Sequence, residues 1–269
     1  MINVREAQSF FGPNDRPQIL PSDAVPPDWQ ELVERTASLD STHYPVDSLA
    51  QILATEHTRL GVPEQSLKAI DSMSSDSVFV VCGQQAGLFG GPLYTLYKAL
   101  HAVRLAQRLG DAAGRNVVPV FWIASDDHDF DEVAGIGIRS SDGSTQRAGY
   151  RPSSYREGMP VGDVVLGDGI GEAILALEKS LPPGERSSHY LNIVREAWRP
   201  GVKWADAFAA QMAAICGQYG LVLLDPRWPG IKRLFSSVMA DEIKQPLAST
   251  DHVNKQADRL EKSGGQSAA

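Results

Sequence analysis

The chain has 269 residues, 42% of them hydrophobic, enough to fill the core of one large α/β domain or of one domain with an insertion. Its formal net charge is −8, and no run of Lys or Arg is long enough to form the footprint of a nucleic-acid or anionic-membrane binder. We therefore expect no nucleic-acid and no membrane partner, although backbone amides of an acidic protein can still bind a small phosphate. Residues 1–11 hold no apolar run, and no stretch of about 18 apolar residues occurs, so we expect a cytoplasmic location.

Helical periodicity dominates the first part of the chain. Apolar residues recur at three- and four-residue intervals between residues 28 and 73, which predicts a helical preface. Residues 78–82 then form a short uncharged run of β-branched and aromatic residues, typical of a buried parallel strand. A glycine-rich loop follows. Pro92 and the apolar positions after it predict a helix that ends near Gly110.

A second apolar strand is predicted at residues 117–124. A strand, a helix and a strand with this spacing form a right-handed crossover unit with parallel strands, which is the core of a Rossmann-like sheet. The unit is half repeated downstream by a helix over residues 204–219, a strand over residues 221–225 and a helix over residues 231–244. The predicted fold class is therefore α/β, with a Rossmann-like parallel sheet and flanking helices.

Between the two parts of this core the sequence becomes polar and glycine-rich. A hairpin signal at Ser141-Asp-Gly143 and a short helix over residues 171–180 indicate an inserted α+β segment. The predicted organisation is a helical preface at residues 1–73, a Rossmann-like core at residues 74–138 and 200–245, an insertion at residues 139–199, and a helical segment with a fraying tail at residues 246–269.

The first candidate site is the glycine-rich loop between a buried strand and a helix N-terminus. Glycine allows close backbone approach and positive φ, and the helix start offers unpaired N–H groups and the positive end of its dipole. These features predict a phosphate or carboxylate site; the alternative is a tight turn that needs glycine only to reverse direction. The spacing matches neither a dinucleotide fingerprint nor a P-loop. The candidate binding residues are Gly83, Gln84, Gln85, Gly87, Gly90, Gly91, Tyr94 and Lys98.

Three of these side chains have open alternatives. Lys98 leans back toward the start of its helix, where it either reaches a bound anion or is solvated beside His101. The adjacent glutamines, Gln84 and Gln85, add amide donors and acceptors beside the loop, although exposed glutamines usually have no special task.

The second candidate site is the acidic loop that follows the second strand. Ligands of open parallel sheets bind outside the carboxyl ends of the strands, so this loop and the glycine-rich loop are expected to face one crevice. His128, flanked by Asp127 and Asp129, is a candidate catalytic general base. Alternatively the carboxylates, including Asp126, hold Mg²⁺ against a nucleotide phosphate. A third interpretation is an acidic loop solvated at the sheet edge.

Asp225 ends the third predicted strand at the same edge, where it either binds a ribose or an amine or caps the next helix. Cys82 ends the first strand with nothing cationic adjoining it in sequence, which favours a buried small hydrophobe over a nucleophile. Cys82 and Cys216 show neither zinc nor CxxC spacing, so we expect two reduced thiols, and the sequence leaves the metal unknown. No function is assigned to the histidines outside any motif, namely His43, His57, His189 and His252.

Two long motifs carry a resemblance to a known family. They are Cys82-Gly-Gln-Gln-Ala-Gly-Leu-Phe-Gly-Gly-Pro-Leu-Tyr-Thr-Leu-Tyr-Lys98 and Pro119-Val-Phe-Trp-Ile-Ala-Ser-Asp-Asp-His-Asp-Phe130. In this order they are similar to the signature of the bacillithiol biosynthesis cysteine-adding enzyme family, and a weaker resemblance extends over residues 204–235. Family members are longer by a second half that carries a coiled-coil segment and further Rossmann-like elements. We therefore expect a truncated chain whose sheet is incomplete relative to the family.

The resemblance implies a ligase that adds L-cysteine to glucosaminyl malate in the last step of bacillithiol biosynthesis, on a core similar to class I nucleotidyl transferases. Activating the cysteine carboxylate implies ATP or another nucleotide, with Mg²⁺ left open, and family members are implied to be homodimers. Those transferases usually carry a HxGH motif where this chain reads Gly91-Pro-Leu-Tyr94. The alternatives are a noncatalytic module that binds a nucleotide or small anion, and another nucleotidyl transferase.

Overall fold

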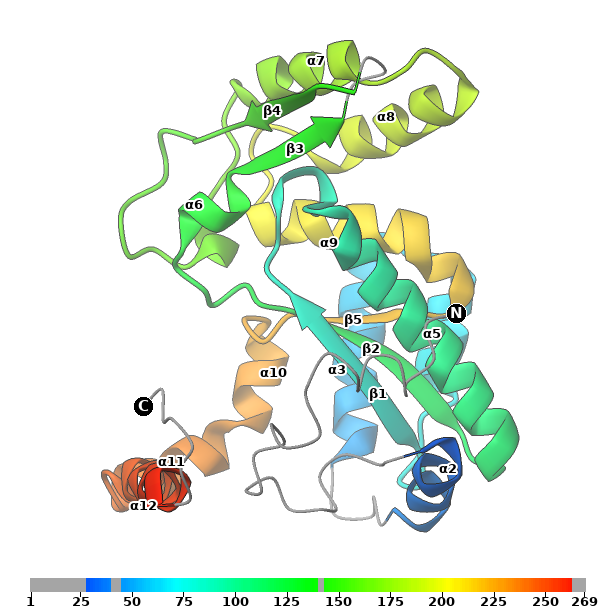
Figure 1. Ribbon diagram of the computed structural model, residues 1–269, viewed down its shortest axis with the longest axis vertical. Coiled ribbons are helices and arrows are strands. Elements are labelled where there is room, and N and C mark those ends of the chain that lie inside the picture. The colour runs from blue at the N-terminus through cyan, green and yellow to red at the C-terminus, as the bar shows by residue number, and fades with distance from the viewer. Residues whose placement is uncertain (1–27, 40–44, 140–142, 263–269) are drawn as a thin grey trace. The chain divides into compact units, whose positions relative to one another are not determined.

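A computed structural model describes residues 28–39, 45–139 and 143–262 of the chain. The chain divides into two compact units, one formed by Asp40–Leu234 and a smaller one formed by Met1–Leu39 and Phe235–Ala269. The described helices of the smaller unit are α2 (Trp29–Ser38), α11 (Ser236–Lys244) and α12 (Ala248–Lys262). All of the predicted site residues lie in the larger unit (Figure 1).

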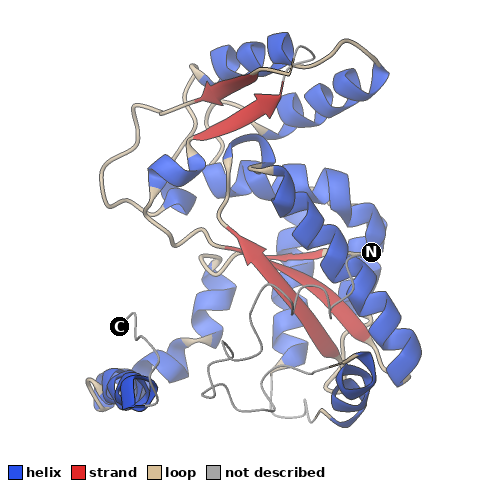
Figure 2. Cartoon of the chain, in the orientation of Figure 1, coloured by secondary structure: helices blue, strands red, loops and turns tan. Residues whose placement is uncertain are grey.

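A three-stranded parallel sheet forms the centre of the larger unit. Its strands are β1 (Val78–Gln84), β2 (Val117–Ile123) and β5 (Val222–Leu224), in the order β1-β2-β5. The strand β1 is joined to β2 by the short 3-10 turn η2 (Leu88–Gly90) and the helix α5 (Leu93–Ala113). This is the predicted crossover unit, and the α/β class with a Rossmann-like sheet is confirmed (Figure 2).

Alternating side chains fill a separate core on each face of the sheet. The helices that cover it are α3 (Val46–Leu60), α4 (Glu64–Asp71), α5 and α9 (Trp204–Cys216). On β2, Phe121 and Ile123 enter one core with residues of α5 and α9, whereas Val118 and Val120 enter the other with residues of α3 and α4. Figure 1 shows α5 and α3 on opposite faces. The strands β2 and β5 are therefore buried between helix layers, as their uncharged sequences predict. The prediction of a buried strand at residues 78–82 is wrong, because β1 lies at the edge of the sheet and only Val78 of it is buried.

The helix α5 extends farther than predicted. It ends at Ala113 rather than near Gly110, because Gly114 takes the left-handed C-cap conformation with φ of 66°. Gly110 stays inside the helix, where an added Cβ would lie only 3.1 Å from the carbonyl oxygen of Arg115. The glycine at position 110 therefore permits close packing and does not end the helix.

Other helical predictions are confirmed in type but not in every boundary. The described residues of the preface form the helices α2, α3 and α4. The helix predicted over residues 204–219 is α9 followed by a 3-10 turn, η4 (Gly217–Tyr219). The prediction of a single helix over residues 231–244 is wrong. The chain forms two helices there, α10 (Pro229–Leu234) and α11, which are separated at Phe235. The predicted tail at residues 264–269 lies outside the described residues.

The inserted segment is an antiparallel hairpin followed by helices. The short helix α6 (Phe130–Val133) precedes the hairpin. The elements that follow are β3 (Gly135–Arg139), β4 (Thr145–Gly149), η3 (Val161–Asp163), α7 (Ile170–Ser180) and α8 (Glu185–Ala197). The antiparallel pairing of the predicted hairpin and the helix at 171–180 are confirmed, and residues 140–142 lie outside the described part. The helix α8 was not predicted. Ile174 and Val194 belong to the same core as Phe208 of α9, and the insertion packs on α9 and on the turn η2.

Among the helices in the described ranges, none is both long enough and apolar enough to cross a membrane.

Candidate functional site

The glycine-rich loop forms a compact turn around η2. The amides of Gly87, Gly90 and Gly91 donate to the carbonyl oxygens of Gln85, Gly87 and Leu88 at 2.9, 3.1 and 3.0 Å. An added Cβ at Gly87 would lie 2.5 Å from the Cα of Gly91, and Gly90 and Gly91 have φ of 90° and 71°. The turn therefore needs these glycines for its own geometry. Their three amides are already bonded, so a ligand would meet the rim of the loop.

Helices α8 and α9 hold this turn from the protein interior. The carbonyl oxygen of Phe89 accepts hydrogen bonds from Tyr190 Oη at 2.8 Å and Gln211 Nε2 at 2.9 Å, and that of Ala86 accepts one from Trp204 Nε1 at 2.6 Å. Phe89 has φ of 51°, a left-handed conformation that costs a non-glycine residue about 1–2 kcal/mol. The buried hydrogen bonds offset that strain. Sequence reasoning missed these three donors because each lies about a hundred residues from the loop.

The solvent-facing rim of the loop carries polar side chains. Lys98 Nζ lies 2.7 Å from Gln84 Oε1 and 3.3 Å from the carbonyl oxygen of Gly83. It also lies 5.4 Å from the ring centre of Tyr94, whose hydroxyl accepts a hydrogen bond from Gln84 Nε2 at 3.1 Å. The N-cap of α5 is Pro92, which supplies no side-chain hydrogen bond. Lys98 thus leans back toward the start of its helix, as predicted.

Gln85 joins this rim to the acidic loop. Its Nε2 donates to Asp127 Oδ2 at 3.3 Å, and Asp127 Oδ1 accepts the backbone N–H of Asp129 at 3.0 Å. The pKa of Asp127 is lowered, first by the hydrogen bond from Asp129 and also by the one from Gln85. His128 is exposed beside this carboxylate. The two loops therefore meet at the carboxyl ends of β1 and β2, as predicted.

The other two carboxylates of the acidic loop have structural partners. Asp129 is the N-cap of α6 and accepts the backbone N–H of Glu132 at 3.3 Å. Asp126 accepts a hydrogen bond from Arg227 Nη1 at 2.7 Å, and the other end of the same guanidinium pairs with Asp163 of η3. Arg227, whose side chain is only 19% exposed, was missed by the sequence analysis. Its one sequence signal is its place two residues after the acid that ends β5.

Asp225 lies at the same edge of the sheet but is 5% exposed. Its carboxylate accepts hydrogen bonds from the hydroxyl of Ser125 and from the backbone N–H of Arg227, the latter at 2.8 Å. Burial raises the pKa of Asp225 despite these two donors. The carboxylate therefore ties the loop after β2 to the loop after β5. It also lines a cavity of about 250 Å³ together with Arg59, Lys203 and Arg227.

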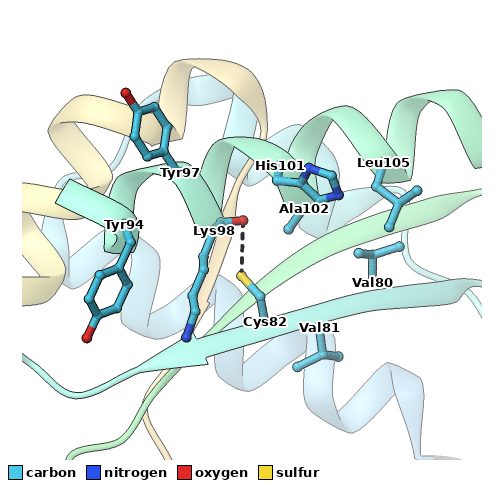
Figure 3. A pocket seen from close by; sticks show the side chains of 9 residues that line it. All are labelled: Val80, Val81, Cys82, Tyr94, Tyr97, Lys98, His101, Ala102 and Leu105. Atoms are coloured by element: carbon cyan, nitrogen blue, oxygen red, sulfur yellow. Dashed lines mark hydrogen bonds between the residues drawn. The ribbon is translucent and has the colours of Figure 1, made fainter. Parts of the chain in front are cut away.

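A separate groove of about 400 Å³ runs between β1 and α5 (Figure 3). It is lined by Val80, Val81, Cys82, Tyr94, Tyr97, Lys98, His101, Ala102 and Leu105. The thiol of Cys82 donates to the carbonyl oxygen of Lys98 at 3.5 Å, and partial burial raises its pKa although the ammonium of Lys98 opposes the shift. Burial raises the pKa of Cys216 to about 11. Both thiols are free and neutral, which favours packing over nucleophilic chemistry for Cys82.

Within the described ranges, no three or more His, Cys, Asp or Glu side chains gather closely enough to hold a metal ion. The residues around His128 therefore form no metal cage of their own.

Residues 23–269 match the family described as bacillithiol biosynthesis BshC, N-terminal Rossmann-like domain. The chain belongs to the BshC family. It is 36% identical over 242 residues to BshC of Salinibacter ruber, covering 87% of this chain and 43% of the relative. It is also 37% identical over 197 residues to BshC of Koribacter versatilis, covering 73% and 36%, and 33% identical over 237 residues to BshC of Heliobacterium modesticaldum, covering 81% and 42%.

The chain thus spans about two fifths of the length of the BshC relatives that it matches, at 43%, 36% and 42%. The matched part contains both sequence motifs and every residue of the two loops at the carboxyl ends of β1 and β2.

Proposed function

We propose that this chain takes part in joining L-cysteine to glucosaminyl malate, the amide-forming last step of bacillithiol biosynthesis. Its relatives are named as cysteine ligases, and its family is described by the same pathway. The observation that carries the proposal is the polar cluster made by the two family motifs, in which Gln85 of the first hydrogen-bonds Asp127 of the second.

Amide formation from a carboxylate requires a better leaving group than oxide. In the proposed reaction a carboxylate oxygen of cysteine attacks the α-phosphorus of ATP or another nucleotide and expels pyrophosphate, which gives an acyl adenylate. Attack at the γ-phosphorus instead expels the nucleoside diphosphate and gives an acyl phosphate. The amine of glucosaminyl malate then attacks the acyl carbon, and the phosphate group leaves with the oxygen. Positioning and electrostatic stabilisation supply much of the rate of such a transfer.

The residues at the rim have chemistry that fits these steps. Lys98 supplies a positive charge beside the N-terminus of α5, where a helix favours an anion. His128, exposed beside the ionised Asp127, is the proposed general base that takes the proton from the attacking amine. Because Mg²⁺ usually needs only one or two protein carboxylates when it comes with phosphates, we propose that any Mg²⁺ arrives on the nucleotide. We place the reaction in the cytoplasm and propose a homodimer as the assembled form.

The direct test is rescue of a bacterial strain that lacks its own bshC gene. The chain alone should restore bacillithiol, measured as its thiol adduct, and the variant Lys98→Met should restore less at equal protein level. The purified chain should also form the amide when it is incubated with ATP, L-cysteine and glucosaminyl malate. An absence of bacillithiol and of the amide, with the chain folded, would contradict the proposal.

A second candidate function is a noncatalytic module that binds a nucleotide or another small anion. The observation in its favour is that Asp126 and Asp129 are held by Arg227 and by the N-terminus of α6, whereas Lys98 supplies a positive charge beside the N-terminus of α5. Calorimetry distinguishes the two proposed functions. A noncatalytic module should bind nucleotide and should show no turnover in the same titration.

A further inference from the structure

We propose that Gln84 and Gln85 are positioning residues, which form an oriented chain of side-chain amides that couples Lys98 on α5 to Asp127 in the acidic loop. The proposal assigns a role to two side chains at the rim of the site. It deepens the proposed function and rests on it for the identity of the anion that binds at Lys98. The coupling itself is carried by the geometry alone.

The chain of hydrogen bonds is continuous from cation to anion. Lys98 Nζ donates to Gln84 Oε1 at 2.7 Å, Gln84 Nε2 donates to Gln85 Oε1, and Gln85 Nε2 donates to Asp127 Oδ2 at 3.3 Å. Gln84 Nε2 also donates to Tyr94 Oη at 3.1 Å, which uses its second proton. The helix α5, the end of β1 and the acidic loop are thus linked through one row of side chains.

The two ends of the chain fix the orientation of both amides. A lysine ammonium can only donate hydrogen bonds and an ionised carboxylate can only accept them. The amide oxygens of Gln84 and Gln85 must therefore face Lys98, and the amide nitrogens must face Asp127. All dipoles then point the same way, and hydrogen bonds in such a row polarise one another.

The backbone holds the first amide in place. The carbonyl oxygen of Gln84 accepts the N–H of Ala124 at 3.0 Å, directly after the pairing of Gln84 with Ile123. At Gly83, an added Cβ would lie 2.8 Å from the carbonyl oxygen of Trp122, so β1 and β2 approach closely there. Gln84 therefore leaves a fixed strand end rather than a free loop.

An anion that binds Lys98 neutralises the charge at one end of the chain. The hydrogen bond to Asp127 then weakens, and the protonated form of Asp127 becomes less unfavourable. By linkage, ionised Asp127 in turn affects the affinity for the anion. The other charged groups around Asp127 are His128, Asp126 and Asp129 in its own loop, and Arg227 with Asp163 from the neighbouring elements.

The test is a titration of the Asp127 carboxyl group by carbon NMR in the full chain without ligand. Lys98→Met and Gln84→Leu should each move the titration midpoint of Asp127 upward, although neither residue touches it. Gln85→Leu, which removes the direct donor, should move it upward as well. The matched control is Gln218→Leu, since Gln218 is an exposed glutamine whose amide donates to Ile215 O at 3.2 Å, and it should leave the midpoint unchanged.

A double-mutant cycle separates the amide chain from simple attraction through space. If the amides carry the coupling, Lys98→Met shifts the Asp127 midpoint in the parent chain but not in the Gln84→Leu chain. Equal shifts in both backgrounds would overturn the proposal. Thermal melting shows whether Gln84→Leu is folded. If it is not, the effect of Lys98→Met on the Asp127 midpoint is compared between the parent chain and Gln85→Leu instead.

A second experiment repeats the titration of Asp127 with pyrophosphate as the bound anion. Pyrophosphate should raise the Asp127 midpoint in the parent chain and not in Gln84→Leu, while Lys98→Met should weaken its binding about tenfold. If pyrophosphate does not bind at all, the nucleotide part of the proposed function fails, and the ligand-free cycle still decides the amide chain.

Discussion

Trp204 donates its indole N–H to the carbonyl oxygen of Ala86 at 2.6 Å, across 118 positions of the chain, and both residues are 0% exposed. The bond ties the first residue of α9 to the backbone directly before the turn η2. A buried carbonyl that loses its donor retains the cost of its lost hydration. The conformation of the glycine-rich loop therefore depends on a helix that follows the whole inserted segment.

Trp204→Phe tests this dependence. The variant leaves the carbonyl oxygen of Ala86 without its indole donor and removes part of a fully buried ring. We expect the free energy of unfolding to fall by about 3 kcal/mol, measured by urea denaturation. The control is Tyr219→Phe, whose residue is 51% exposed and which should change stability by less than about 0.5 kcal/mol. Equal effects of the two variants would contradict the role of the buried bond.

The stability of the chain should depend on pH because of the buried histidine His57. His57 is fully buried, its Nδ1 donates to Leu53 O at 2.8 Å, and its Nε2 accepts the N–H of Leu223 at 3.0 Å, which links α3 to β5. Burial lowers the pKa of His57 from 6.5 to about 4. Between these values the unfolded chain binds a proton that the folded chain does not, so stability is complete above pH 6.5 and falls as the pH falls toward 4.

The expected loss from this histidine has a slope of up to about 1.4 kcal/mol per pH unit within that window. Urea denaturation of the parent chain and of His57→Gln at pH 7 and pH 5 isolates it from the carboxylates, because a glutamine side chain does not titrate. The difference in stability between the two chains should shrink at pH 5. A difference independent of pH would show that the pKa of His57 is the same in the folded and the unfolded chain.

The strands and the positions of the two loops could be predicted because local patterns fix them. Uncharged runs such as that at β2 indicate buried strands, and the carboxyl ends of parallel strands lie at one edge of a sheet. The burial of β1 could not be predicted in the same way, because the sequence of a strand does not show that it lies at the edge of the sheet. The partners of the loops could not be predicted, since Gln211 and Tyr190 reach Phe89 from helices that are distant in sequence. Local patterns carry no information about such pairings.

The phosphate or carboxylate site predicted at the glycine-rich loop shows the same limit of local patterns. The glycines of the loop indicate positive φ and close approach, and both occur, but the sequence does not reveal where the amides point. The amides of Gly87, Gly90 and Gly91 close the turn on itself. Likewise Asp225 was correctly placed at the sheet edge, yet its burial depends on Ser125 and Arg227, which no spacing rule connects.

Arg227→Met should disturb the acidic loop more than it disturbs the fold. The variant releases Asp126 of that loop and Asp163 of η3 at once. Because both acids are partly solvated, the cost in stability should be about 1 kcal/mol, measured by urea denaturation. The control is Lys244→Met, whose ion pair with Asp241 is 72% and 75% exposed and should contribute nothing measurable. Hydrogen exchange of the acidic loop should rise in Arg227→Met only; unchanged exchange there would contradict the prediction.

His128→Ala should reduce the proposed ligase activity far more than His189→Ala. Both histidines are exposed, but only His128 lies beside the ionised Asp127 at the carboxyl end of β2. Loss of a general base typically lowers the rate by about 10²–10⁴-fold. Turnover of the two variants is compared at equal folded fraction, checked by thermal melting. Indistinguishable turnover would return His128 to the interpretation of a solvated loop residue.

The outer edge of β1 predicts self-association of this chain. Within the described residues β1 pairs with β2 alone, and its seven residues include no charge and no proline to discourage another strand. Val81 on this strand is 60% exposed and Tyr97 on α5 is 64% exposed, both along the groove of Figure 3. An unpaired edge beside exposed apolar side chains favours pairing with another copy.

Light scattering across a concentration series measures this self-association. Val81→Lys should shift the chain toward the monomer, because a charge on an edge strand opposes strand addition. Leu175→Lys is the matched control, since Leu175 is 54% exposed on α7, away from the groove, and the same charge there should leave the association unchanged. If both variants dissociate alike, net charge and not the β1 edge controls association. If the parent chain is monomeric at every concentration, the edge of β1 is protected in a way that its exposed side chains do not indicate.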